Sequence, residues 1–269
     1  MNIEERLKIV QNPRRPNVLE YIDYLFPSFI EMHGDRVNGD DSAVIGGIAT
    51  FNGIRVTVIG QIRGRTSYEC EKYNFSMVRP AGFRKALRLM KQAEKFKRPI
   101  ICFVDTLGAD PSMEAEANGQ NVAIANNLME ILMLEIPIIS IFIGYGCSGG
   151  AMAFAIANEV IFLENAFLSV LSPKGCAKLL WNDSTRGDEA AKILKITAGE
   201  NKEWGFVDRI VCEPVGGAHM NKEMVFDNVK SILEEVLCKY ERMTGEQVKI
   251  ERYQKYRKLG NELFDCYSE

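Results

Sequence analysis

The sequence is poor in the side chains that bind metals. It has only 2 histidines in 269 residues, and of its 7 cysteines the closest pair is Cys212 and Cys238. An odd number of cysteines without a short spacing argues against a disulfide framework and against a zinc site. We therefore expect no metal on this chain, and cysteines that behave mostly as small buried hydrophobic residues.

The chain also lacks a long apolar run and an excess of charge of either sign. No uninterrupted apolar stretch reaches the roughly 20 residues that cross a membrane, and the opening residues do not resemble a signal peptide. Lysine and arginine number 33 against 36 aspartates and glutamates, well mixed along the chain. This balance argues against a nucleic-acid surface. We expect a cytoplasmic protein that binds neither nucleic acid nor membrane.

The most informative stretch of the sequence is a glycine-rich turn between a strand and a helix. Residues 138–143 are apolar and mostly β-branched, which is typical of a strand buried on both faces. A helix of small residues is expected over 151–157. The turn between them contains Gly144, Gly146, Gly149 and Gly150. Such a turn lets backbone N–H groups approach a ligand, and a helix N-terminus can stabilise an oxyanion. The alternative is that the glycines only allow helix and sheet to pack closely.

A second glycine-bearing turn follows a second expected strand. Residues 99–104 predict a buried strand that leads into residues 105–112. Strands that alternate with helices imply parallel strands with right-handed crossovers. Both turns would then lie at the carboxyl edge of the sheet, where ligands bind in open α/β folds. The sequence thus predicts an α/β fold, and we expect one domain over residues 1–269.

Further patterns predict the elements around these turns. Strands over 43–50 and 54–60 are separated by Asn52-Gly53, which is a hairpin signal, and a basic loop with Arg63 and Arg65 follows. These guanidinium groups could hold a phosphate or carboxylate, or could be solvated. Additional strands are expected over 159–163, 167–170 and 207–211. Helices are expected over 18–32, 80–97, 113–134, 172–181, 186–197, 222–243 and 247–259.

Several motifs, in this order along the chain, resemble the alpha subunit of bacterial acetyl-CoA carboxylase carboxyltransferase. The principal ones are Asp105-Thr-Leu-Gly-Ala109, Gly144-Tyr-Gly-Cys-Ser-Gly-Gly-Ala151, Ser172-Pro-Lys-Gly-Cys-Ala177 and Glu213-Pro-Val-Gly-Gly-Ala-His219. Asn12-Pro-Arg-Arg-Pro16 and Gly34-Asp-Arg36 extend the likeness over nearly the whole chain. The resemblance implies a crotonase/ClpP-like fold of repeated β-β-α units, with a short helical lead-in and flanking C-terminal helices.

The resemblance also implies a reaction and its site. The family moves a carboxyl group from carboxybiotin on a carrier protein to acetyl-CoA, which gives malonyl-CoA for fatty acid biosynthesis or related metabolism. Backbone oxyanion holes would stabilise the biotin ureido oxygen and the thioester enolate. By position, the donor amides are those of Gly149, Gly150, Gly108 and Ala109. The residues expected beside the substrate are Arg63, Arg65, Tyr145 and Asp110. We expect Gly150→Val to abolish transfer with little effect on folding.

The partners implied are a beta subunit, a biotin carboxyl carrier protein and an acyl-CoA, within an ATP-binding complex. No cofactor would be bound covalently to this chain, and zinc would belong to the beta partner. The assembly would be a hetero-oligomer, most simply alpha2beta2, and this chain alone would be inactive.

Some residues depart from the usual family pattern at the turns, and other functions stay open. The departures include Leu107, Asp110, Tyr145, Cys147 and Lys174. They change the lining of the site, so one alternative is a non-catalytic or repurposed paralogue that acts as an oligomer subunit.

Another alternative is a ClpP-like serine peptidase, because Ser148 precedes a helix. That mechanism needs a histidine base, and only His33 and His219 are available. We expect Ser148 to be an N-cap instead.

Overall fold

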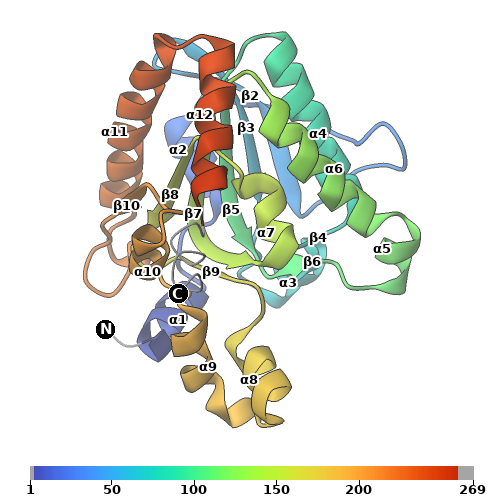
Figure 1. Ribbon diagram of the computed structural model, residues 1–269, viewed down its shortest axis with the longest axis vertical. Coiled ribbons are helices and arrows are strands. Elements are labelled where there is room, and N and C mark those ends of the chain that lie inside the picture. The colour runs from blue at the N-terminus through green and yellow to red at the C-terminus, as the bar shows by residue number, and fades with distance from the viewer. Residues whose placement is uncertain (1–2, 260–269) are drawn as a thin grey trace, which may run out of the picture.

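The computed structural model describes residues 3–259 as an α/β structure built on one sheet of eight strands. Its helices, labelled in Figure 1, are α1 (Ile3–Gln11), α2 (Val18–Leu25), α3 (Ser67–Lys72), α4 (Pro80–Lys95), α5 (Met113–Ala117), α6 (Gln120–Met133), α7 (Ser148–Ala155), α8 (Pro173–Trp181), α9 (Gly187–Leu194), α10 (Ala198–Glu203), α11 (Lys222–Glu241) and α12 (Gly245–Lys258). The strands of the large sheet are β1 (Ile30–Glu31), β2 (Val44–Phe51), β3 (Ile54–Gln61), β5 (Ile100–Thr106), β7 (Ile138–Cys147), β8 (Glu159–Leu163), β9 (Phe167–Ser169) and β10 (Arg209–Val211), and a small second sheet pairs β4 (Met77–Val78) with β6 (Gly108–Ala109).

The parallel strands predicted from the sequence form the centre of the large sheet. The strand order is β1-β2-β3-β5-β7-β8-β10, with β9 paired to β7. β1, β2 and β3 pair antiparallel, whereas every pairing from β3 onward is parallel. The central strands β5 and β7 therefore end at the same edge, and Thr106 pairs with Gly146 there.

Helices cover both faces of the sheet. A Cβ atom on Gly46 of β2 would lie 2.4 Å from Cδ1 of Leu89 in α4, whereas one on Gly60 of β3 would lie 2.4 Å from Cγ2 of Val18 in α2. The two glycines are offset by one residue in the β2–β3 register, so they face opposite sides of the sheet. α11 packs against α2, and α6 packs against α4 and α7.

The expected hairpin between β2 and β3 is confirmed. Phe51 pairs with Ile54, which leaves a loop of Asn52 and Gly53 only. Both loop residues have positive φ, 46° and 83°. This is the conformation that a type I′ turn requires and that Asn-Gly adopts at little cost.

The helix expected over residues 18–32 is wrong in its second half. α2 ends at Leu25, and Ile30 and Glu31 form the edge strand β1 instead. Pro27 accounts for the end, because the residue before a proline is disfavoured in the helical conformation. Phe26 accordingly has φ −133° and ψ 63°. Beyond Pro27 the apolar residues do not form one buried helical face, because Ile30 is 62% exposed.

Of two other expected helices, one is interrupted and one ends early. The segment 113–134 forms α5 and α6, separated at Gly119, which has the left-handed φ of 82°. The segment 186–197 ends as α9 at Leu194, and Thr197 begins α10 with a capping box to Glu200. The spacing of the apolar residues alone did not predict where these helices end.

Within the part of the chain that the structure describes, no group of three or more His, Cys, Asp and Glu side chains is arranged to hold a metal ion. No helix in residues 3–259 combines the length and apolar character needed to cross a membrane. Of the cysteines in that range, Cys102, Cys147 and Cys176 are buried, and Cys266 lies outside it.

Asp35 fixes the loop that connects β1 to β2. Its Oδ1 accepts N–H groups from Val37, Asn38 and Gly39 at 2.8–3.0 Å, and its Oδ2 accepts Nε of Arg84 in α4 at 2.7 Å. Burial by itself would raise the pKa of this carboxyl, but the hydrogen bonds outweigh burial and lower the pKa to about 2. The ionised form therefore stabilises the fold.

We expect Asp35→Asn to lower the free energy of unfolding by about 2 kcal/mol at pH 7. Because the folded pKa is depressed, this stability is fully present above the unfolded value near 4 and is lost as the pH falls toward 2. Urea denaturation between pH 7 and pH 3 should show the difference between wild type and variant shrinking. Asp23→Asn on an exposed face is the control. A difference that is constant with pH would contradict this role.

Candidate active site

The two glycine turns meet at the carboxyl edge of the sheet. β5 ends at Thr106 and β7 at Cys147, and α7 begins immediately after β7. A Cβ atom on Gly150 would lie 2.4 Å from the carbonyl carbon of Gly108 and 2.6 Å from the nitrogen of Ala109. Real Cβ contacts are never this short, so only glycine at position 150 lets the backbones of the two turns touch. The turns are together, whereas the role of their amides stays a prediction.

The N-terminus of α7 has no side-chain cap. Its N-cap residue is Cys147, which makes no capping hydrogen bond. Burial raises the pKa of the Cys147 thiol to about 12, so the thiol is neutral at pH 7 and is not a nucleophile. The amides of Gly149 and Gly150 lie in this first turn, where N–H groups have no partner inside the helix. The positive end of the helix dipole thus points out of the carboxyl edge.

The two predicted donors of the facing turn are not equivalent. The N–H of Gly108 already donates to Oγ1 of Thr106 at 3.0 Å. The nitrogen of Ala109, in contrast, faces Gly150 across the contact described above. Of this pair, Ala109 is therefore the better candidate for an oxyanion donor. The sequence could not distinguish them, because the Thr106 hydroxyl is brought to Gly108 only by the folded turn.

Gln61 is a functional candidate that sequence reasoning missed. It is fully buried at the end of β3, and its Nε2 donates to the carbonyl oxygen of Gly150 at 2.9 Å. Its Oε1 accepts the N–H of Asp105 at 3.2 Å. One side chain thus joins both turns and fixes their spacing. The available signal was a glutamine directly after the apolar run of residues 58–60 in β3.

Asp105 and Arg63 form a buried pair beneath the turns. Oδ1 of Asp105 accepts the N–H of Tyr145 at 2.8 Å, and Oδ2 lies 3.5 Å from Nε of Arg63. Nη1 of Arg63 donates to the carbonyl oxygen of Val10 at 2.7 Å, and the guanidinium lies 5.2 Å from the centre of the Tyr145 ring. The guanidinium of Arg63 therefore already has partners within the protein. It holds Asp105, Tyr145 and the lead-in segment together.

Most of the expected substrate-binding residues line one pocket beside the turns. The pocket has a volume of about 230 Å3 and is lined by Gln11, Pro13, Arg63, Gly64, Arg65, Cys70, Phe75, Ser76, Leu107 and Tyr145. Arg65 also forms an ion pair with Glu20 at 2.7 Å. Burial raises the pKa of the Tyr145 hydroxyl, although the charge of Arg63 opposes this shift. Tyr145 is thus a neutral, half-buried wall of the pocket.

Asp110, the remaining expected substrate contact, does not line this pocket. Its carboxylate accepts Nδ2 of Asn74 at 3.0 Å and the N–H of Ser112 at 2.9 Å, and lies 3.3 Å from Nε of Arg79. Burial would raise the pKa of Asp110, but these hydrogen bonds and the Arg79 charge lower it. The carboxylate stabilises the turn after β6.

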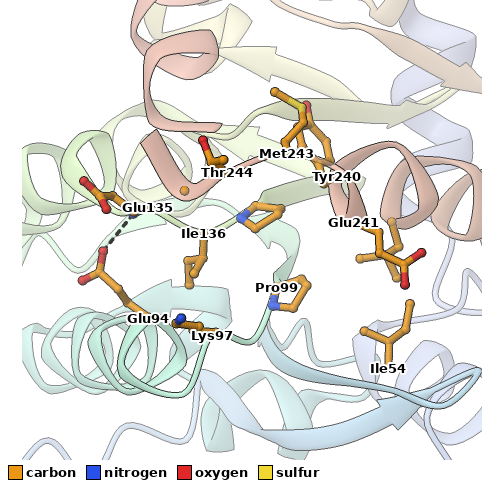
Figure 2. Close-up of a pocket in the computed structure, with 13 residues that line it drawn as sticks. Ile54, Glu94, Lys97, Pro99, Glu135, Ile136, Tyr240, Glu241, Met243 and Thr244 are labelled. Carbon is orange, nitrogen blue, oxygen red and sulfur yellow. Dashed lines mark hydrogen bonds between the residues drawn. The ribbon is translucent and has the colours of Figure 1, made fainter. Parts of the chain in front are cut away.

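A larger pocket, of about 690 Å3, lies at the opposite edge of the sheet. Figure 2 shows it between the end of α4, the loop before β7 and the connection from α11 to α12, with Glu94 accepting the backbone N–H of Glu135 at 2.8 Å. It includes Pro99 and Pro137, which precede β5 and β7. Because it lies at the amino ends of these strands, it contains neither glycine turn. Its size alone does not make it the active site.

The structure does not support the peptidase alternative. Ser148 is exposed with φ 55°, but Nδ1 of His33 lies 2.9 Å from Asp40, and Nε2 of His219 lies 3.1 Å from Asn12. Among the described residues, no hydrogen bond joins Ser148 to either imidazole. The N-cap expectation for Ser148 is also wrong: the sharp turn out of β7 places Ser148 in the left-handed region, whereas an N-cap residue needs an extended backbone.

Residues 1–260 match the family model described as acetyl co-enzyme A carboxylase carboxyltransferase-like. The chain is 51% identical over 258 residues to the acetyl-coenzyme A carboxylase carboxyl transferase subunit alpha of Clostridium perfringens, which covers 96% of this chain and 95% of that protein. It is 47% identical over 264 residues to the subunit of the same name from Bacillus cytotoxicus, with 98% of this chain and 82% of that protein covered.

Solved structures with low sequence identity share the fold. Transcarboxylase 12S with hydrolysed methylmalonyl-coenzyme A bound has a TM-score of 0.71 at 17% identity, over 90% of this chain and 46% of that chain. A Pseudomonas malonate decarboxylase hetero-tetramer in complex with malonate has a TM-score of 0.67 at 17% identity, over 87% of this chain and 91% of that chain. The expected crotonase-like α/β fold is thereby confirmed.

Proposed function

Because this chain belongs to the acetyl co-enzyme A carboxylase carboxyltransferase-like family, as a subunit of the alpha type, we propose that it transfers a carboxyl group from carboxybiotin on a carrier protein to acetyl-CoA. The product would be malonyl-CoA, for fatty acid biosynthesis in the cytoplasm. The observation that supports this most directly is the contact of the Gly150 backbone with the turn of Gly108 and Ala109 beside an uncapped helix. It concentrates backbone donors at one sheet edge.

These donors suit the chemistry of carboxyl transfer. Negative charge develops on a ureido or enolate oxygen, and fixed N–H groups stabilise it without the transfer of a proton from a side chain. We assign this role to the amides of Gly149 and Gly150, with the amide of Ala109 from the facing turn. Removal of one such donor typically costs about 3 kcal/mol in the transition state. Gln61 would keep the donors at a constant separation.

The pocket beside the turns would bind the substrate. Arg65 is the residue we assign to an anionic group of the substrate, because its guanidinium is partly exposed and its pair with Glu20 can be exchanged. Arg63 would act indirectly, since its charge is already used by Asp105. Tyr145 would offer an apolar wall.

The reaction needs a site for biotin and a site for the thioester, and residues 3–259 form a single pair of touching glycine turns. We therefore assign this chain to one half of the site and a beta subunit to the other, with zinc on that partner. A symmetric alpha2beta2 assembly is the simplest form. The biotin carboxyl carrier protein would dock where the halves meet.

A repurposed paralogue is the alternative that specific side chains favour. Leu107 and Tyr145 line the pocket, and Cys147 lies directly before α7. Leu107 and Tyr145 alter the surface of the pocket itself, whereas Cys147, Asp110 and Lys174 lie outside its lining. The same experiment decides between the two functions.

We expect the purified chain to be inactive alone and to gain activity with its beta subunit. The assay mixes the full chain, the beta subunit and a biotinylated carrier, and measures malonyl-CoA-dependent carboxylation of biotin and the forward transfer to acetyl-CoA. Controls omit each component in turn. Transfer by the isolated chain would refute the shared site. A complex that assembles but transfers nothing would favour the repurposed paralogue.

A further inference from the structure

Two sequence motifs without an assigned role lie in contact in the folded chain. The Asn12-Pro-Arg-Arg-Pro16 segment follows α1, and the Glu213-Pro-Val-Gly-Gly-Ala-His219 turn follows β10. Arg15 pairs with Glu213, and Asn12 Nδ2 lies 3.1 Å from Nε2 of His219. The motifs are some 200 residues apart, so only the tertiary structure joins them.

The pair of Arg15 and Glu213 is fully satisfied and closed to solvent. Both side chains are at most 1% exposed, and two parallel N–H···O bonds of 2.7 Å join them. The remaining Nε of Arg15 donates to the carbonyl oxygen of Ile143, near the end of β7, at 2.8 Å. The carboxylate of Glu213 also accepts the N–H groups of Asn165 and Ala218. A bidentate pair of this kind fixes orientation as well as distance.

The segment immediately before Arg15 forms one rim of the substrate pocket. We call residues 10–13 the strap. Gln11 and Pro13 line the pocket together with Tyr145. At its other end the strap is held by Nη1 of Arg63, which donates to the carbonyl oxygen of Val10. The strap is thus tied to the walls of the pocket at Val10 and to the core at Arg15.

We propose that Arg15 is a positioning residue, which holds the strap over the pocket and so sets the width of the opening next to Tyr145. The guanidinium acts through the strap, because it is buried and touches no part of the pocket. Its hydrogen bond to the carbonyl oxygen of Ile143 anchors the guanidinium to β7, the strand that also contains Tyr145. The effect of Arg15 on catalysis rests on the proposed function, whereas its effect on the position of the strap is independent of that function.

Thiol labelling of the full chain tests the position of the strap directly. Cys70 lines the pocket and is half-buried, whereas Cys102 and Cys176 are buried elsewhere. In Arg15→Lys the charge stays but the bidentate pair is lost, and we expect maleimide to label Cys70 at least about tenfold faster, as for a local opening. Peptide mapping by mass spectrometry separates the sites. Arg14→Lys, the same change at an exposed neighbour, is the matched control.

The buried thiols distinguish opening of the strap from unfolding. Cys102 and Cys176 should stay unlabelled in Arg15→Lys. If they react along with Cys70, the same comparison is made with Gln11→Ala, which shortens a strap side chain at the rim of the pocket and leaves the buried pair intact. Unchanged Cys70 labelling in Arg15→Lys, or in Gln11→Ala where that variant is used, overturns the proposal.

Kinetics of the complex with the beta subunit give the second readout. We expect Arg15→Lys to change KM for one of the two substrates by about tenfold and kcat by less than about twofold. The reason is that the strap would contact the bound substrate equally in the ground state and in the transition state. Equal loss in kcat and kcat/KM would overturn the positioning role. Absence of activity in the wild-type complex would refute the proposed function, while the labelling result would still decide the position of the strap.

Discussion

Replacement of Gly150 by alanine should lower carboxyl transfer by at least about 100-fold in the assembled enzyme. The added methyl group would lie 2.4 Å from the carbonyl carbon of Gly108 and 2.6 Å from the nitrogen of Ala109. The two turns must then separate, so the amides no longer converge on one oxygen. Overpacking against backbone should also lower the free energy of unfolding by about 1–3 kcal/mol.

The expected loss of stability differs from the expectation based on the sequence alone. There, a valine at position 150 was expected to abolish transfer with little effect on folding. The structure shows that the side chain would first meet the protein's own backbone. Loss of stability should therefore accompany loss of activity.

Two glycines serve as matched controls for Gly150→Ala. Gly149→Ala places a methyl group 3.5 Å from Cγ2 of Ile124, an ordinary contact, and should not lower stability. Gly199→Ala in α10 meets nothing within 4 Å and should leave transfer unchanged without lowering stability. Stability is measured by urea denaturation, and transfer by malonyl-CoA formation. Near-normal turnover in Gly150→Ala would remove the oxyanion assignment.

Replacement of Glu213 alone should destabilise the chain more than replacement of both members of its pair. Glu213→Leu leaves the guanidinium of Arg15 buried without a counterion, and we expect a loss of about 3–5 kcal/mol in the free energy of unfolding. The double variant R15M/E213L removes both charges. Apolar replacement of a buried pair is often nearly neutral. We expect the double variant to recover at least half of the loss.

A double-mutant cycle over R15M, E213L and their combination, measured by urea denaturation, gives the coupling energy. R186M in the exposed pair of Arg186 and Glu189 is the control and should change the free energy of unfolding only slightly, because solvent screens exposed charges. Additive effects of R15M and E213L would contradict a direct coupling of the two side chains. Since the strap depends on the same pair, the double variant should fold and still label faster at Cys70.

The sequence alone determined the features that depend on local patterns. Asn52-Gly53 predicted the hairpin because positive φ is a property of those two residues. Alternating strands and helices predicted a parallel sheet with both glycine turns at one edge, because crossover connections have one hand. The order of the motifs led to the family. None of these inferences needs to know which atoms meet across the fold.

Tertiary structure decided which groups in the turns are still available. The Gly108 amide is engaged by Thr106, and Arg63 is engaged by Asp105 and Val10. Neither engagement has a signature in composition or periodicity. Gln61 likewise joins the two turns through contacts with residues 44 and 89 positions away. An amide or guanidinium becomes a binding group only if folding leaves it without a partner, and its partner is set by the whole chain.

The same reason explains the largest surprise among the charged residues. The segment 247–259 has the composition of a charged surface helix, yet Arg252 of α12 is completely buried. Its guanidinium donates to the carbonyl oxygen of Ile136 at 3.2 Å, to Oδ1 of Asn158 at 2.6 Å and to the carbonyl oxygen of Leu134. Leu134 and Ile136 lie in the connection from α6 to β7, and Asn158 directly precedes β8. Local sequence gives a side chain its charge, but only the packing of distant segments places carbonyl groups around it.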